Sequence, residues 1–180
     1  GSVSGRLVSA VDFAPTMLSL VGANVPPKMQ GSVFLGAAAA TPRQYVFGAR
    51  DRCDTTEMTL RTVCDARYRY ILTETPEVPL LAPSNYKETQ YPVWNLLKEL
   101  NAQGKLTPAQ AFLCAPTQPR EQLFDLVNDP DQQRNLAGSS APADVAALQR
   151  LRAALGEWRR EIRDPLLDRK STRLNSSHVK

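Results

Sequence analysis

The stretch EQLFDLVNDPDQQRNLA, residues 121–137, decides the fold. Apolar side chains alternate between two directions over residues 121–127, which predicts a β-strand with one wholly apolar face. The segment Asn128-Asp129-Pro130-Asp131 carries the residue types that favour a type I turn. We therefore expect this stretch to hold a sheet in place rather than to do chemistry.

A long amphipathic helix is predicted after this stretch, over residues 142–163. Its apolar residues recur at three- and four-residue spacing, and most of its arginines lie elsewhere around the helix. The apolar residues are Leu148, Leu151, Leu155, Trp158 and Ile162, and the arginines are Arg150, Arg152, Arg159 and Arg160. We expect this helix to pack on a small antiparallel sheet, which gives an α+β fold.

The remaining strands are expected upstream. Residues 44–50, 59–66 and 67–74 are rich in β-branched and aromatic side chains, and the last two segments are joined by a turn around Asp65-Ala66-Arg67. Between these strands and the opening stretch, YPVWNLLKELNAQG predicts a helix that begins at Pro92 and ends before Gly104. Thr107-Pro108 then begins a short helical segment.

The N-terminal part predicts one more helix. Asp12 is in position to cap FAPTMLSLV, and Gly22 is in position to end it. The proline-rich and alanine-rich residues 24–42 are typical of a connector. The apolar residues that share one face of this helix are Phe13, Met17, Leu20 and Val21.

The composition excludes several classes of partner. The chain has 180 residues, 42% of them hydrophobic, and no apolar run near the roughly 18 residues that a membrane span needs. The net charge of +4 comes from residues 169–180, because 22 − 4 leaves 18 basic residues against 18 acidic ones. These residues, RKSTRLNSSHVK, contain the sole histidine, His178, and resemble translated sequencing-adapter sequence. With them set aside, no clustered basic face predicts binding to nucleic acid or to an anionic membrane.

The thiols and acids favour no metal site. Cys53, Cys64 and Cys114 are irregularly spaced, which favours three buried or inert thiols over a disulfide framework or a zinc ribbon. A calcium loop formed by Asp125, Asp129 and Asp131 would lack the ligand spacing and the glycine of an EF-hand. We therefore interpret these aspartates as part of a solvated turn.

A resemblance rests on the order of several motifs. In chain order they are VDFAPTMLSLVG, ARDRCD, RYRYILTETPEVP, YPVWNLLKELNAQGKLTPAQAF and PREQLFDLVNDPDQQRNLA. Together they resemble the C-terminal part of a sulfatase of the alkaline phosphatase superfamily, on the branch similar to heparan N-sulfatase.

The resemblance implies a domain division. The α/β catalytic domain would end with residues 1–36, and a connector, residues 37–43, would lead to the C-terminal subdomain. This sheet-and-helix subdomain would consist of residues 44–168. A non-native tail, residues 169–180, would follow it. The opening GSVSGRLVSAVDF is typical of mid-protein sequence. We therefore expect a parent chain that begins upstream, and the family is usually exported.

The catalytic residues of that family are not found in this chain. Sulfatases resemble one another in a Cys-x-Pro-x-Arg signature, whose cysteine becomes formylglycine, and in a Ca²⁺ ion held by Asp and Asn side chains. The near match CAPTQ, residues 114–118, has Gln118 where the arginine belongs. We predict no catalytic or metal-binding residue here, and a parent that uses Ca²⁺ and formylglycine.

Substrate contacts are predicted in GARDRCDTTEM, residues 48–58. Guanidinium groups suit bidentate contacts to sulfate and carboxylate, and the corresponding family segment lies near the rim of the active site. The alternative is a salt-bridged loop, and Thr55 stands where the family usually has glutamate. The candidate substrate-binding residues are Arg50, Asp51, Arg52 and Asp54.

Two classes of function remain open at this stage. The first is a fragment of a sulfatase that acts on sulfate esters or N-sulfate groups, with a sulfated small molecule or glycan and the rest of the parent chain as partners. The second is a non-catalytic interaction or structural module. A phosphatase or phosphodiesterase of the same superfamily is a further alternative to the sulfatase.

Overall fold

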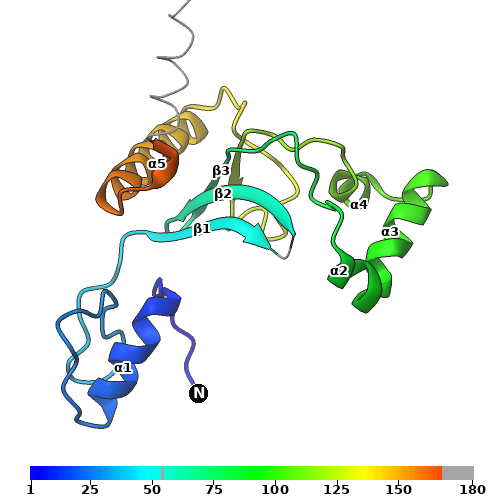
Figure 1. Ribbon diagram of the computed structural model, residues 1–180. Helices are drawn as coiled ribbons and strands as arrows, with labels where there is room; N and C mark the ends of the chain where they lie inside the picture. Colours follow the sequence, from blue (N-terminus) through cyan, green and yellow to red (C-terminus); the bar gives the residue numbers. More distant parts are fainter. Residues whose placement is uncertain (54, 168–180) are drawn as a thin grey trace, which may run out of the picture.

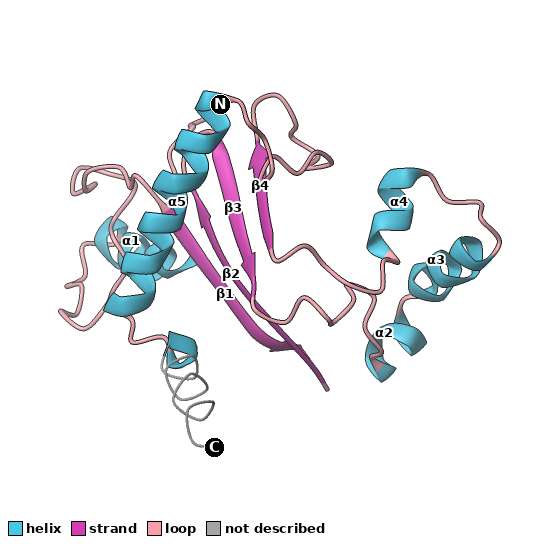
Figure 2. Cartoon of the chain, turned by 90° about the horizontal axis from the view of Figure 1, so that it is seen from above, coloured by secondary structure: helices cyan, strands magenta, loops and turns pink. Residues whose placement is uncertain are grey.

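The computed structural model describes residues 1–53 and 55–167, and its centre is a four-stranded antiparallel sheet (Figure 1). The strands are β1 (Val46–Cys53), β2 (Thr56–Cys64), β3 (Tyr68–Thr73) and β4 (Glu121–Asp125), in the spatial order β1-β2-β3-β4. Helix α5 (Pro142–Glu161) lies along one face of this sheet (Figure 2). The predicted α+β fold is confirmed.

The core forms where α5 meets the sheet. Leu151 and Leu155, spaced by one helical turn, are almost fully buried against side chains of β2, β3 and β4. Burial of one leucine side chain contributes about 1.5–3 kcal/mol, so a stripe of such residues fixes the helix on the sheet. The buried cluster consists of Val63, Tyr68, Tyr70, Leu123, Ala147, Leu148, Leu151 and Leu155.

The opening stretch supports the outer edge of the sheet. The Asn135 side chain accepts a hydrogen bond from the Leu123 amide at 3.0 Å and donates one to the Glu121 carbonyl at 3.1 Å. The Leu136 amide donates to the Leu123 carbonyl at 2.8 Å. The segment after the turn therefore satisfies backbone groups that an edge strand would otherwise leave open.

The strand within this stretch ends two residues earlier than expected. It stops at Asp125, and both of its faces are buried from Gln122 to Asp125, so the expected single apolar face is wrong. Asp125 ends the strand because its carboxylate accepts hydrogen bonds from the Val127 and Asn128 amides and from the Arg67 guanidinium. The Arg67 guanidinium holds the pKa of Asp125 well below its usual range.

The turn that follows is shifted by one residue. The hydrogen bond from the Gln132 amide to the Asp129 carbonyl, 3.0 Å, makes Asp129 the first residue of the turn and Pro130 the second. The Asp129 carboxylate accepts from two further backbone amides, those of Gln133 and Arg134. The Asp129 carboxylate thus binds backbone donors of the protein itself.

Asp12 does not cap helix α1 (Phe13–Leu20) as predicted. A short 3₁₀ helix, Ala10–Asp12, precedes α1, and no side-chain capping bond is formed by Asp12 to α1. The buried carboxylate instead binds the Arg43 guanidinium and the Ser9 and Ser32 amides. These contacts, led by Arg43, lower the pKa of Asp12 from 3.8 to about 2.

Close packing joins the segment after α1 to the helix. A Cβ atom on Gly31 would lie 1.9 Å from the Val11 carbonyl oxygen, so only glycine fits there. Gly22, at φ +73°, ends the helix as predicted. The expected apolar face of α1 is exposed, since Phe13, Met17 and Leu20 all lie on the surface.

Three short helices are inserted between β3 and β4. They are α2 (Asn85–Gln90), α3 (Pro92–Ala102) and α4 (Pro108–Leu113), and they stand away from the sheet in both views (Figures 1 and 2). The predicted α3 and α4 are confirmed, and α4 is capped by Thr107, whose side chain forms a capping box with Gln110. Helix α2 was not predicted from the sequence. Among the described residues, no helix combines the length and the apolar character that crossing a membrane requires.

Candidate functional site

A β-bulge lies where the sequence places the substrate contacts. Arg50 is opposite Leu60 and Arg52 is opposite Glu57, so β2 advances three residues while β1 advances two. The extra residue on β2 bends the end of the hairpin, and such bulges are frequent beside binding sites because they redirect side chains. Asp54 lies outside the described residues.

Asp51 is part of a charge network on the face of the sheet that α5 covers. Its carboxylate accepts a 2.8 Å hydrogen bond from Arg61, whose side chain is 3% exposed. Arg61 also donates to both oxygens of Asp164, at 2.9 and 3.1 Å. Asp51 therefore neutralises a buried guanidinium, a role that the proposal of a substrate contact did not include.

Arg159 completes this network from α5. It donates to Asp164 at 2.7 Å and contacts Glu74 at 2.9 Å, and its side chain is 5% exposed. The prediction that Arg159 lies on the polar side of the helix is therefore wrong. Its long side chain is buried because both of its carboxylate partners are buried with it.

The end of α5 positions Asp164. Arg163 adopts a left-handed conformation, at φ 52°, and the Asp164 amide bonds to the Arg159 carbonyl at 2.8 Å, as in a Schellman motif. Burial by itself would raise the pKa of Asp164, but hydrogen bonds from Arg61, the Leu166 amide and Arg159 outweigh it and lower the pKa to about 2. Asp164 is thus a carboxylate fixed between two arginines.

Arg52 lies at the surface beside this network. It forms an exposed ion pair with Glu57 at 2.6 Å. A cavity of about 320 Å³ lies here, lined by Asp51, Arg52, Glu57, Thr59, Pro165 and Leu166. The structure therefore brings Asp51 and Arg52 together at one small cavity.

Arg50 points to the other face of the sheet. Successive strand residues alternate between the two faces, and Asp51 is directed toward α5 by its contact with Arg61. The half-buried Arg50 makes no ion pair within residues 1–53 and 55–167, and its Nε atom is buried without a hydrogen-bond partner there. Among the residues that the structure describes, neither Arg50 nor Arg52 is therefore held in a buried ion pair.

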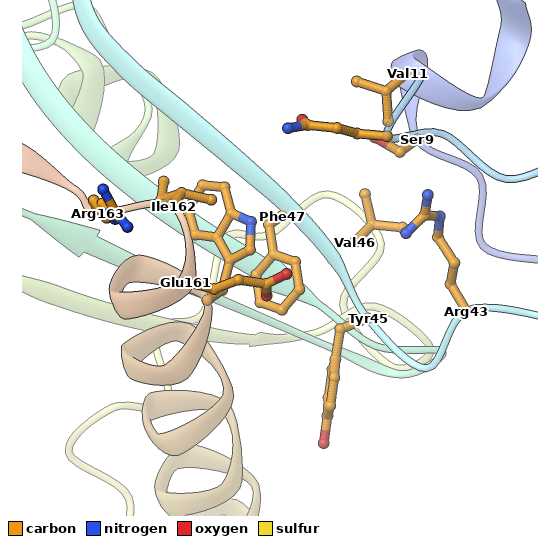
Figure 3. Close-up of a pocket in the computed structure, with 11 residues that line it drawn as sticks. Ser9, Val11, Arg43, Tyr45, Val46, Phe47, Glu161, Ile162 and Arg163 are labelled. Carbon is orange, nitrogen blue, oxygen red and sulfur yellow. The ribbon is translucent and has the colours of Figure 1, made fainter. Parts of the chain in front are cut away.

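A larger cavity of about 750 Å³ lies between the N-terminal segment, the start of β1 and the end of α5 (Figure 3). Phe47 and Trp158 stack at its wall with ring centroids 5.0 Å apart, and Arg43 and Glu161 add charges. Its lining comes from segments separated by more than a hundred residues. No local pattern in the sequence predicts this cavity.

The segment CAPTQ, residues 114–118, which nearly matches the sulfatase signature, has a structural role. The Gln118 amide group donates to the Val78 carbonyl at 2.5 Å, and the Gln118 backbone amide donates to the Pro76 carbonyl at 2.7 Å. Cys114 ends α4, and its sulfur lies 3.6 Å from the Leu97 carbonyl. Gln118 thus links its own loop to the loop that contains Pro76 and Val78. Its neutral side chain supplies no fixed positive charge beside Cys114.

The thiols are less enclosed than predicted. Cys53 is exposed, and Cys64 and Cys114 are half-buried, so of the two expected states, buried or inert, burial does not hold for Cys53. Burial raises the pKa of Cys64. Across the part of the chain that the structure describes, no group of three or more His, Cys, Asp or Glu side chains could hold a metal ion. The residues described therefore do not fit a calcium site.

Comparison with known proteins gives sulfatases in both sequence and structure. An ulvan-active sulfatase from Formosa agariphila is 38% identical over 159 residues, which are 88% of this chain and 26% of that protein. A second ulvan-active sulfatase from the same organism is 27% identical over 145 residues, again 26% of its length. No family model matches the chain.

The solved structures agree on the fold. A 2-O GAG sulfatase superposes with a TM-score of 0.55 at 18% identity, covering 87% of this chain and 26% of that one. A putative sulfatase from Bacteroides thetaiotaomicron gives 0.53 at 19% identity, covering 87% and 25%. A protein solved in complex with its substrate D-glucosamine-2-N,6-O-disulfate gives 0.51 at 17% identity, covering 89% and 26%.

The sheet, the helix across it and the 38% identity to an ulvan-active sulfatase match the C-terminal part of a sulfatase. The chain belongs to the sulfatase family, and it spans about a quarter of the length of the relatives it matches.

Proposed function

We propose that this chain forms one wall of the substrate cleft in a sulfatase that removes sulfate groups from glycans. The observation that carries the proposal is the end of the β1–β2 hairpin, where Arg50 and Arg52 flank a bulge and neither forms a buried ion pair within residues 1–53 and 55–167. A guanidinium recognises sulfate and carboxylate through parallel hydrogen bonds, which is the chemistry that an anionic sugar requires.

The two arginines would act differently. Within the described residues Arg52 pairs with the exposed Glu57, and an exposed ion pair contributes about 0–1 kcal/mol, so a sulfate group could replace Glu57 at little cost. The Nε–H of Arg50 is a buried donor that has no acceptor among the described residues, and supplying it with one would remove a penalty of about 1–3 kcal/mol. Asp51 would position the hairpin through Arg61, and Asp54 stays a proposed contact.

The remaining features of the enzyme belong to the rest of the parent chain in this proposal. Calcium and formylglycine would be held there, because the residues described here offer neither a metal cluster nor a Cys-x-Pro-x-Arg signature. We propose removal of sulfate groups in general as the activity of the parent enzyme. Cleavage of N-sulfate groups, as on the heparan N-sulfatase branch, is a more specific proposal within it. The names of the relatives, which include ulvan-active and 2-O GAG sulfatases, favour a polyanionic glycan as substrate.

The test uses a chimera in which this chain replaces the matching segment of the ulvan-active sulfatase that is 38% identical. Arg52→Ala and Arg50→Ala are each expected to raise KM for an ulvan oligosaccharide about tenfold while leaving turnover of a small aryl sulfate unchanged. Arg134→Ala, an exposed arginine beyond β4 at the opposite edge of the sheet, is the matched control. Equal losses on both substrates, or no loss on either, would contradict the proposal.

A further inference from the structure

The three inserted helices form an arm, which we define as residues 84–114. None of the residues in α2, α3 and α4, all of which the structure describes, is buried. Several large apolar side chains of the arm are exposed, among them Val93 at 57% and Leu96 at 49%. The exposed apolar residues of the arm are Tyr86, Tyr91, Val93, Leu96, Phe112 and Leu113.

The arm starts from a fixed base. At one end the Thr56 hydroxyl donates to the Pro83 carbonyl at 2.7 Å, which ties the arm to the end of the β1–β2 hairpin. At the other end Gln118 bonds to Pro76 and Val78. The arm therefore leaves the sheet at a defined place, beside the candidate substrate contacts.

Its internal contacts are too few to stabilise it alone. The helices have 6, 11 and 6 residues, whereas isolated helices shorter than about 12–15 residues are marginal in water. Fixing the backbone of each residue costs about 1–2 kcal/mol, and three helices with no buried residue recover little of this through the hydrophobic effect. The Glu88–Lys98 ion pair contributes about 1 kcal/mol at most, and the contact between the Tyr86 and Tyr91 rings about 0.5–1.5 kcal/mol.

We propose that the arm packs its apolar side chains against the part of the sulfatase polypeptide that precedes this chain. The matched segment is only about a quarter of the relatives' length, so a large polypeptide is available to cover the arm. The occupant is argued from the chemistry of the surface, since leucine, valine and phenylalanine side chains suit a protein interior better than a polyanionic glycan. This inference rests on the proposed function, because it takes the chain as one part of a sulfatase.

The consequence is a mechanical link between the arm and the cleft. Since the base of the arm is bonded to the end of the hairpin, docking of the arm would also fix the position of Arg52 relative to the catalytic part. The arm is then an interaction surface that positions a substrate contact.

Hydrogen exchange measured by mass spectrometry tests this inference on two proteins, the 180-residue chain and the chimera described above. Arm amides are expected to exchange at least 100-fold more slowly in the chimera than in the chain, while β2 and β3 amides stay protected in both. Leu96→Lys is expected to remove most of this protection from the arm. Ala102→Lys adds the same charge to an exposed position about 120° around the same helix and is expected to change nothing.

Unchanged arm exchange in the chimera would overturn the inference. Protection that already exists in the 180-residue chain and rises with its concentration would also overturn it, because the occupant would be a second copy. The proposed function fails separately. A chimera that hydrolyses ulvan oligosaccharides with an unprotected arm contradicts the docking alone, and a protected arm in a chimera whose arginine variants behave as wild type contradicts the substrate contacts alone.

Discussion

Replacement of Asp164 by asparagine is expected to be among the most damaging isosteric changes in this protein. The carboxylate accepts four hydrogen bonds, two from Arg61, one from Arg159 and one from the Leu166 amide, at 2.7–3.2 Å. An asparagine side chain fills the same space but offers one acceptor oxygen. Its amide group would face guanidinium donors and leave them unpaired.

The loss of stability in Asp164→Asn depends on which ion pairs remain in the network. Removal of one partner from a buried pair costs about 3–5 kcal/mol when the other charge is left alone. Here Arg61 keeps Asp51 and Arg159 keeps Glu74, so the loss should fall near the lower limit, about 3 kcal/mol. For a domain of this size that loss lowers the melting temperature by about 6–12 °C.

Urea titration followed by circular dichroism measures this loss. The control is Glu57→Gln, which breaks the exposed pair with Arg52 and is expected to cost less than about 1 kcal/mol. If Asp164→Asn costs no more than Glu57→Gln, the buried network does not stabilise the fold and the reasoning is refuted.

The same residue predicts a dependence on pH. The pKa of Asp164 is lowered on folding from 3.8 to about 2, so the stabilisation is complete above about pH 4 and is lost as the pH falls toward 2. At about 1.4 kcal/mol per pH unit this amounts to at most about 2.5 kcal/mol, and less where water screens the pair. The free energy of unfolding of the wild type should therefore fall more steeply between pH 4 and 2 than that of Asp164→Asn, and parallel curves would contradict the assignment.

Three further predictions concern the opening stretch, the chemistry and the tail. Phe124→Ala is expected to cost about 3–5 kcal/mol because the ring is buried, whereas Asp129→Asn should cost under about 1 kcal/mol, and comparable losses in a urea titration would show that the turn carboxylate is essential. The 180-residue chain should not hydrolyse an aryl sulfate with added calcium, and turnover that disappears in Cys114→Ala would identify Cys114 as a nucleophile after all. Deletion of residues 169–180, which lie outside the described residues, should leave the melting temperature unchanged in calorimetry, and a loss of several degrees would show that they pack on the domain.

The strands and long helices were predictable because their side-chain periodicity is local. The alternation in Tyr68 and Tyr70 and the spacing of Leu151 and Leu155 each reflect one face of one element, and the structure buries those faces together. The turn at residues 65–67 followed from the same local pattern. Helix α2 has six residues and no apolar stripe, so periodicity could not reveal it.

The pairing and burial of the charged side chains were not predictable from local periodicity. Arg159 follows Leu155 by four residues and so continues the buried stripe, but an arginine there is buried only because Asp164 and Glu74 lie within reach. Those partners come from a turn and from the end of β3, and no sequence pattern joins them. For the same reason the sequence named Asp51 as a candidate substrate contact but could not show that Arg61 binds it.

The insertion of residues 74–120 between two paired strands has a consequence for how the chain folds and varies. Strands β1, β2 and β3 are joined by short turns and can pair early, whereas β4 must return across the whole insertion before it meets β3. The entropy of closing such a loop grows only slowly with its length, by about 0.6 kcal/mol for each doubling. Homologues could therefore lengthen, shorten or replace the arm with little effect on the stability of the sheet, so the surface beside the hairpin is free to diverge while the scaffold that carries it stays constant.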